Sequence, residues 1–216
     1  MNQTDKHHIL AVCGLNKNFG ALAAIDDLSV EIPKKGIFGI IGPNGSGKTT
    51  LFNIISGRYP ANSGSIFYRG QELLGRSSEN IATLGIARTF QNIRLFARLS
   101  VIENILGAQT CAADVSLLQA MVPHLAQERR RRSIALEILD QVGLSDRQNL
   151  LAHQLSLGEQ RRLELARVIA RKPDIMMLDE PASGMTPHET EVMADLIENI
   201  AKDGPTILLI EHKIGM

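Results

Sequence analysis

The sequence has few cysteines, few aromatic residues and no excess of charge of either sign. Its two cysteines, Cys13 and Cys111, form no Cys-x-x-Cys pair, which excludes a disulfide framework and a cysteine-based zinc site. Aromatic residues make up 4% of the 216 residues and tryptophan is absent, so we expect a mainly aliphatic core. The 23 basic and 23 acidic residues cancel, which argues against binding to nucleic acid through bulk charge. A neutral chain is prone to self-association, which suits a subunit with partners.

Long apolar runs are also missing. No stretch of roughly 18 apolar residues occurs, so we expect no membrane span. Residues 1–8 are polar and lack the apolar segment of a secretion signal. Hydrophobic residues make up 44% and charged residues 21% of the chain, values typical of a globular protein. The length predicts one domain, or one domain with a sub-lobe.

Three short apolar runs stand out, at residues 37–41, 175–178 and 207–210. Continuous apolar runs of this length predict parallel strands buried on both faces. A glycine-rich loop follows the first run, Asp179 and Glu180 follow the second, and Glu211 and His212 follow the third. Ligands of open α/β sheets bind at the carboxyl ends of the strands, so the three ends predict one shared site.

The remaining segments have other patterns. Residues 28–32 alternate between apolar and polar side chains, and residues 65–68 are short and β-rich, which predicts an antiparallel sheet beside the parallel core. Residues 102–150 are helix-rich and contain a basic run at 127–132. A basic run can bind nucleic acid or lipid headgroups. Because acidic residues lie nearby and the net charge is zero, we interpret it as a solvated helix face.

The loop after the first apolar run matches the G-x-x-x-x-G-K-[ST] pattern of phosphate-binding loops. It consists of Gly42, Pro43, Asn44, Gly45, Ser46, Gly47, Lys48 and Thr49. Glycines let backbone N–H groups surround an anion, Lys48 supplies charge to the β- and γ-phosphates, and the Thr49 hydroxyl binds Mg²⁺. A helix from Lys48 onward, with Thr50 in its first turn, directs its positive end at the phosphates. A chance glycine turn matches the pattern in about one chain in a hundred of this length.

The acidic pair after the second run predicts metal binding and water activation. Adjacent residues of an extended strand point to opposite sides, so one carboxylate can serve the metal and the other the attacking water. We assign Asp179 to Mg²⁺, through water, and Glu180 to orienting or deprotonating the nucleophilic water. His212 is expected to hydrogen-bond the γ-phosphate and that water. The alternatives are an exposed Asp-Glu-Pro turn and a structural or solvated histidine.

Residues 155–162, with the sequence Leu-Ser-Leu-Gly-Glu-Gln-Arg-Arg, resemble the signature motif of ABC ATPases. The phosphate loop, Gln91, the acidic pair, residues 183–186 and His212 follow in the order of that family, over essentially the whole chain. Residues 87–96 and 180–187 are more specifically similar to ATP-binding subunits of branched-chain amino acid importers.

This resemblance implies a fold of the ABC ATPase type. The expected fold class is an α/β P-loop NTPase whose core is a mixed, mostly parallel sheet, with an antiparallel β sub-lobe and a helical sub-lobe. Residues 1–216 are expected to form a single ABC ATPase domain, with the helical sub-lobe at about residues 92–155. The chain is expected to lack the C-terminal end that family members have.

The resemblance also implies roles for individual residues. Gln91 is implied at the Mg²⁺ ion and at the contact with a membrane subunit, and Phe19 at the adenine, although Phe19 can also be a core residue. Ser156 and the Gly158 N–H are implied to bind the γ-phosphate held by a second subunit. The pair Ser156 and Glu159 also matches a capping box, which by itself merely starts a helix through Arg171.

Three residues depart from the family pattern. Leu157 stands where the signature usually has Gly, Glu159 where it usually has Gln, and Lys213 where an acidic residue usually follows the histidine. A carboxylate near a triphosphate is unfavourable unless it points away or caps the helix. Glu159 and the short C-terminus leave the dimer stability and the ATPase rate open.

The implied function is ATP-driven closure of a dimer that powers import of a small solute, a branched-chain amino acid or a similar small polar compound, with ATP and Mg²⁺ as cofactors. The implied partners are a second identical or related ATP-binding subunit, integral membrane permease subunits and, indirectly, a solute-binding protein, with no nucleic acid. The protein is then peripheral, at the cytoplasmic face of the cell membrane. Ile93, Leu95 and Phe96 are expected either to dock on the permease or to pack internally.

Two alternatives belong to other functional classes. One is a soluble ABC ATPase acting on DNA or ribosomes, but the segment between Lys48 and Ser156 is too short for long coiled coils, and the chain has one ATPase unit. The other is a nucleotide-dependent binding or regulatory module with little turnover, which Glu159 and the short C-terminus favour.

Overall fold

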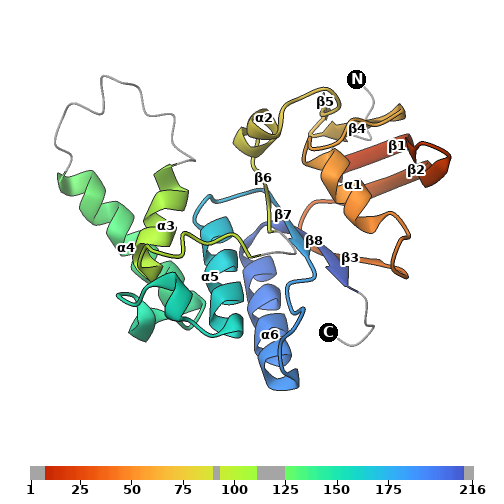
Figure 1. Ribbon diagram of the computed structural model, residues 1–216. Coiled ribbons are helices and arrows are strands. Elements are labelled where there is room, and N and C mark those ends of the chain that lie inside the picture. Colours follow the sequence, from red (N-terminus) through yellow and green to blue (C-terminus); the bar gives the residue numbers. More distant parts are fainter. Residues whose placement is uncertain (1–7, 90–92, 111–124, 212–216) are drawn as a thin grey trace. The chain divides into compact units, whose positions relative to one another are not determined.

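The computed structural model describes residues 8–89, 93–110 and 125–211 (Figure 1). The chain divides into two compact units. The first comprises Met1–Arg88, Asp174–Glu180 and Glu198–Met216, and the second comprises Thr89–Pro173 and Pro181–Ile197. In the described part of the chain, no helix is both long and apolar enough to cross a membrane.

The first unit contains a parallel sheet with the strand order β3-β8-β7-β6. Its strands are β3 (Gly36–Ile41), β6 (Ile86–Arg88), β7 (Ile175–Asp179) and β8 (Thr206–Glu211). The three apolar runs therefore form parallel strands, as predicted. The expectation that all are buried on both faces is wrong for β3, where Ile37 and Ile41 are 38% and 56% exposed. β3 lies at the edge of the sheet, whereas β7 is central and buried throughout.

An antiparallel sheet with the order β2-β1-β4-β5 completes the strands of the first unit and confirms the predicted antiparallel sub-lobe. Its strands are β1 (His8–Phe19), β2 (Leu22–Pro33), β4 (Ser63–Tyr68) and β5 (Gln71–Glu72). The helices α1 (Lys48–Ile55) and α2 (Ser78–Thr83) also belong to this unit.

A buried apolar cluster joins these elements. Leu10 and Leu15 of β1, Phe52 and Ile54 of α1 and Ile175 of β7 are all buried in it. Burial of one such side chain stabilises a fold by about 1.5–3 kcal/mol. The cluster therefore fixes α1 between the two sheets, and this places the loop that precedes α1 at the carboxyl end of β3.

The second unit is mainly helical. The helices α3 (Val101–Thr110), α4 (Leu125–Gln141) and α5 (Leu157–Ile169) pack against one another, and the short helices η3 (Ser145–Arg147) and η4 (Ala152–Gln154) lie between α4 and α5 in the chain. The helix α6 (Pro187–Asp203) contributes residues to both units. Residues 92–155, the expected helical sub-lobe, lie within the second unit.

The basic run lies on α4. Arg129, Arg130 and Arg132 are exposed, as expected of a solvated helix face. Arg131 is half-buried, and its Nη2 donates to the carbonyl oxygen of Leu106 at 2.8 Å. This arginine therefore connects α4 to α3 and is not part of the solvated face.

Candidate functional site

The phosphate loop has a backbone that requires glycine at several positions. Gly45 and Gly47 have φ angles of 81° and 88°, in the left-handed region that glycine adopts at least cost. A Cβ atom at Gly47 would overlap the carbonyl oxygen of Ala24, and one at Gly42 would lie 2.7 Å from Ser46 Oγ. The loop is thus a cradle whose backbone leaves no room for a side chain at Gly42 or Gly47 unless neighbouring atoms shift.

Helix α1 begins directly behind this loop, as predicted. Its N-cap is Gly47, no side chain caps it, and its first turn has no acidic residue. The first N–H groups of a helix have no partner within the helix, and together with the helix dipole they favour an anion. The N-terminus of α1 is therefore suited to bind a phosphate group.

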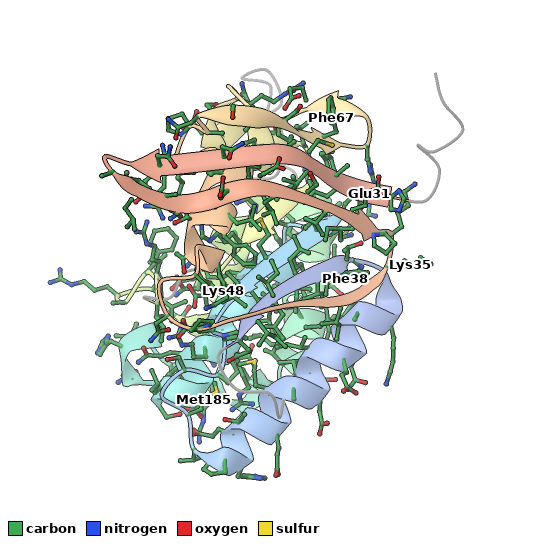
Figure 2. The ribbon with its side chains drawn as sticks, turned by 90° about the vertical axis from the view of Figure 1, so that its right-hand side faces the viewer. Glu31, Lys35, Phe38, Lys48, Phe67 and Met185 are labelled. Carbon is green, nitrogen blue, oxygen red and sulfur yellow. The ribbon has the colours of Figure 1, made fainter. Side chains whose placement is uncertain are left out.

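Lys48 is folded over the loop that it is predicted to serve. Its Nζ donates to the carbonyl oxygens of Gly42 at 2.6 Å and Pro43 at 2.9 Å, and its side chain is buried. Figure 2 shows Lys48 below the hairpin of β1 and β2. A phosphate bound in the cradle would give this ammonium group a stronger, charged acceptor than either carbonyl.

The acidic pair lies at the carboxyl end of β7, and the two residues have different backbones. Asp179 is the last residue of the strand and is 2% exposed. Glu180 has a φ angle of 49°, and its N–H donates to the carbonyl oxygen of Ile210 at 3.0 Å. The prediction that both follow the alternation of an extended strand is wrong, because Glu180 is left-handed. Such a conformation in a non-glycine residue costs about 1–3 kcal/mol and is often found at functional sites.

A buried ion pair at this sheet edge was missed by the sequence interpretation. Arg88 Nη2 and Asp179 Oδ2 lie 2.8 Å apart, and both side chains are buried. A signal was present in the sequence: Arg88 directly follows two apolar residues, as Asp179 directly follows the apolar run at 175–178. Parallel pairing of β6 and β7 brings these carboxyl ends together.

Phe19 ends β1 and is 44% exposed, so the alternative of an ordinary core residue is wrong. The ring of Tyr59, itself 42% exposed, meets it edge-on with the centroids 5.7 Å apart. Lys17 Nζ lies 5.0 Å from the Phe19 centroid. An exposed aromatic of this kind is able to stack on a base, and the accompanying Tyr59 was not predicted from the sequence.

A cavity of about 590 Å³ lies between the hairpin of β1 and β2 and the phosphate loop. Its wall is mainly aliphatic, with Leu28, Val30 and Ile32 among the lining residues, and Lys48 and Gly47 line only part of it. Aliphatic walls cannot replace the water that a triphosphate loses on binding. The aliphatic part of this cavity is therefore unsuited to a triphosphate.

The signature residues in the second unit form the start of α5. Ser156 Oγ accepts from the Glu159 N–H at 3.3 Å, and Glu159 Oε2 accepts from the Ser156 N–H at 2.9 Å, which confirms the capping box. The Ser156 N–H hydrogen bond, with Arg147 Nε 3.2 Å away, holds the pKa of Glu159 below its ordinary value. The helix ends at Ile169, two residues before the predicted Arg171. Leu157 is 45% exposed.

Close packing surrounds the signature glycine. A Cβ atom at Gly158 would overlap the carboxylate of Glu189. Glu189 in turn caps α6, with its Oε2 accepting from the Thr186 N–H at 2.9 Å and from the Thr186 hydroxyl at 2.8 Å. Thr186 lowers the pKa of Glu189 through these bonds. Any larger residue at position 158 displaces a side chain that stabilises the start of α6.

Two predicted site residues, Gln91 and His212, lie outside the described residues. Of the expected docking residues, Ile93 and Leu95 are half-buried and Phe96 is 52% exposed. The guanidinium carbon of Arg167 lies 4.9 Å from the Phe96 ring centroid, and an Arg167 Nη1 hydrogen bond reaches the Arg94 carbonyl oxygen. Of the three expected docking residues, only Phe96 has a largely exposed side chain.

A family model described as ABC transporter matches residues 25–183, which include the loop, the acidic pair and the start of α5. The chain belongs to the ABC transporter family. Two relatives are branched-chain amino acid transport ATP-binding proteins. LivG of Salmonella typhimurium is 43% identical over 213 residues, covering 96% of this chain and 83% of LivG. BraF of Pseudomonas aeruginosa is 40% identical over 212 residues, covering 96% of this chain and 83% of BraF.

Solved structures of ABC cassettes have the same fold. The ADP conformation of MJ1267, an ATP-binding cassette of an ABC transporter, has a TM-score of 0.82 at 28% identity, covering 96% of this chain and 82% of that chain. The predicted fold class and the resemblance to subunits of branched-chain amino acid importers are confirmed. This ABC transporter chain is a nucleotide-binding ATPase, and the two alternative functional classes are not favoured.

Proposed function

We propose that this protein is the ATP-binding and ATP-hydrolysing subunit of an importer of branched-chain amino acids. The observation that carries the proposal is the uncapped start of α1 behind a glycine cradle, with Lys48 folded over it. The relatives at 40–43% identity, whose names specify branched-chain amino acid transport, support the solute. Residues 1–216 then act as one ABC ATPase domain.

The nucleotide is ATP, held by its phosphates at the loop and by its base at Phe19. The phosphate-binding residues are Gly42, Pro43, Asn44, Gly45, Ser46, Gly47, Lys48, Thr49 and Thr50. Stacking on an aromatic ring contributes about 1–3 kcal/mol per base. Phe19 suits this role because its side chain is 44% exposed.

The residues present also suit Mg²⁺. The Thr49 hydroxyl and the Asp179 carboxylate are oxygen donors, which this ion prefers, and the resemblance adds Gln91. Within the described ranges, no cluster of three His, Cys, Asp or Glu residues is able to hold a metal. Nucleotide-bound Mg²⁺ needs none, because it is bound through one or two side chains together with phosphate oxygens. When bound, it neutralises charge that develops on the phosphates.

Hydrolysis depends on the residues around the γ-phosphate. Lys48 moves its ammonium group from the loop carbonyls to the phosphates and stabilises their charge. The Glu180 carboxylate orients the attacking water and accepts its proton, and His212 hydrogen-bonds that water and the γ-phosphate. The backbone of Glu180 is left-handed, so its side chain does not continue the alternation of the strand that ends at Asp179.

The working assembly contains two ATP-binding subunits, identical or related. Ser156 and the Gly158 N–H of one subunit bind the γ-phosphate at the loop of the other. ATP closes this dimer and hydrolysis opens it. The motion passes to integral membrane permease subunits near residues 91–96, and a solute-binding protein delivers the amino acid. The protein is then peripheral, at the cytoplasmic face of the cell membrane.

The substitution Glu180→Gln tests the ATPase role. Loss of a general base lowers a rate by about 10²–10⁴-fold, and the uncharged amide leaves ATP binding intact. We expect ATP-dependent dimers of Glu180→Gln to accumulate, which light scattering measures. The rate of hydrolysis is measured as steady-state phosphate release with the permease supplied. Glu79→Gln, on the exposed surface of α2, is the matched control. A normal rate in Glu180→Gln removes Glu180 from this role.

The solute is tested separately, with the subunit and its permease in vesicles. We expect ATP-driven accumulation of labelled leucine, isoleucine and valine, and none with Lys48→Ala. Accumulation of other solutes, with none of these three, would contradict the solute and leave the ATPase role intact.

A further inference from the structure

The ion pair between Arg88 and Asp179 has a cost that stability alone does not explain. The two side chains are 7% and 2% exposed, and Nη2 of Arg88 donates to Oδ2 of Asp179 at 2.8 Å. Taking both charges out of water opposes folding, and apolar residues of equal volume often serve stability as well or better. One member of the pair, Asp179, is also the proposed metal ligand, which suggests a role for the pair in metal binding.

The guanidinium group of Arg88 is also fixed from its other side. Its Nη1 donates to Asn53 Oδ1 at 2.7 Å and to Ser56 Oγ at 3.3 Å. Its Cζ lies 5.4 Å from the ring centroid of Phe52. Arginine is able to bind in both directions at once because its donors form a rigid planar fork, whereas lysine offers a single point charge.

The partners of Arg88 belong to two elements of the proposed site. Asn53 and Phe52 lie on α1 and Ser56 is its C-cap, whereas Asp179 ends β7. The same helix begins with Lys48 and Thr49. Arg88 therefore joins the strand that carries the acidic metal ligand to the helix that carries the hydroxyl ligand and the phosphate-binding lysine.

We propose that Arg88 is a positioning residue for the metal ion of the nucleotide. It holds the Asp179 carboxylate in a fixed orientation and keeps it in register with α1. Partners that orient a metal ligand typically change metal affinity or activity by about 10- to 100-fold when they are removed. The inference rests on the proposed function, because it assumes that Mg²⁺ and nucleotide bind at this edge.

The opposite role, in which Arg88 competes with the metal for Asp179, requires a guanidinium group that swings away. The contacts with Asn53, Ser56 and Phe52 and the burial of Arg88 hold it in place. The two roles have opposite signs: removing a positioning residue raises the Mg²⁺ concentration required, and removing a competitor lowers it.

The experiment measures binding of a fluorescent ATP analogue during Mg²⁺ titration and in excess EDTA. With Arg88→Met, we expect half-maximal enhancement of binding to require about 10- to 100-fold more Mg²⁺, with the affinity in EDTA within about twofold of wild type. Arg88→Lys restores part of the effect. Asn53→Ala, which removes one support of the guanidinium and leaves both charges paired, shifts the Mg²⁺ requirement in the same direction by less.

The matched control is Arg69→Met. Arg69 pairs with Asp174 at 2.6 Å in the same unit, with both side chains partly exposed, and it is not part of the site. We expect wild-type Mg²⁺ dependence from it. Circular dichroism shows whether each variant folds. If Arg88→Met does not fold, the Mg²⁺ requirement of Asn53→Ala tests the proposal.

An unchanged or lowered Mg²⁺ requirement in the folded Arg88 and Asn53 variants overturns the proposal, since a purely structural pair changes only the melting temperature. Failure of the wild-type protein to bind the analogue, with or without Mg²⁺, instead overturns the proposed function.

Discussion

The N-termini of α1 and α5 handle their N–H groups in opposite ways. At α5, Ser156 and Glu159 form a capping box that satisfies two N–H groups, their own, within the chain. At α1, glycine is the N-cap and no side chain takes part. Among the α-helices of the described residues, α1 alone has no acidic residue in its first turn; the others have Glu79, Glu103, Glu128, Glu159 and Glu189.

On the proposed function, this difference distinguishes an anion site that one chain forms alone from an anion site that needs a second chain. A carboxylate in the first turn stabilises a helix by about 0.3–1 kcal/mol, and α1 forgoes that gain. The first N–H groups of α1 therefore face no acidic residue of their own helix turn and are suited to a phosphate. The start of α5 already carries the Glu159 carboxylate, so a second anion there meets a negative charge. We therefore expect tight binding at α1 in one chain and weak, dimer-dependent contact at α5.

The largest effect tests the α1 side. Lys48→Ala removes the ammonium group that lies over the phosphate loop and is expected to abolish ATP binding, with affinity lowered at least about 100-fold. Equilibrium binding of labelled ATP measures this. Lys202→Ala, an exposed lysine of α6, serves as control. Unchanged affinity would refute the phosphate-loop assignment and with it the contrast between the helices.

Ser156→Ala tests the α5 side. We expect ATP binding by the single chain to stay unchanged, ATP-dependent dimerisation to be lost, and the free energy of unfolding to fall by about 1 kcal/mol, because the N-cap is removed. Ser77→Ala removes an equivalent cap from α2, where Ser77 Oγ accepts from the Asn80 N–H, and is expected to leave dimerisation intact. Loss of ATP binding in monomeric Ser156→Ala would mean that the site does not divide between two chains.

Glu159→Gln sharpens the comparison with a smaller effect. The amide keeps the hydrogen-bonding capacity of the capping box and removes the negative charge beside a partner's phosphate. We expect ATP-dependent dimers to form at roughly threefold to tenfold lower protein concentration, since one charge interaction at a helix terminus is worth about 0.3–1 kcal/mol and partly buried ones more. Analytical ultracentrifugation at several salt concentrations measures this. A weaker dimer would show that the carboxylate itself is needed.

The pH dependence of stability gives the smallest effect. The folded-state pKa of Glu159 lies below its ordinary value of 4.5, mainly because of the Ser156 N–H hydrogen bond. Ionised Glu159 therefore stabilises the fold above that value, and the contribution is lost as the pH falls through the folded-state pKa. The stability difference between wild type and Glu159→Gln should shrink from neutral pH towards acid. Urea unfolding at several pH values measures the free energy of unfolding of both proteins. A stability difference that stays constant with pH would contradict the expected role of ionised Glu159.

Features carried by contiguous residues could be predicted from the sequence. The phosphate loop, the strands that precede each site residue and the capping box at Ser156 depend on neighbours within a few positions, where spacing alone fixes the geometry. The contact of Arg88 with Asp179 joins residues 91 positions apart and depends on β6 lying beside β7, which no local pattern states. The meeting of Phe19 with Tyr59 is of the same kind.

Backbone conformation explains the other differences. Strand alternation predicted the direction of Glu180, but β7 ends one residue earlier and Glu180 is left-handed. The apolar run of β3 predicted full burial, but its place at the sheet edge leaves one side of the strand partly exposed. Both errors came from applying the rule for a strand interior to a residue or strand at a boundary.

The exposed ring of Phe19 gives this tryptophan-free chain an optical use. An indole introduced as Phe19→Trp would be the sole one in the molecule, seated where the base is proposed to stack. Its emission could then follow nucleotide arrival in real time, with no attached dye and no competing signal from other indoles.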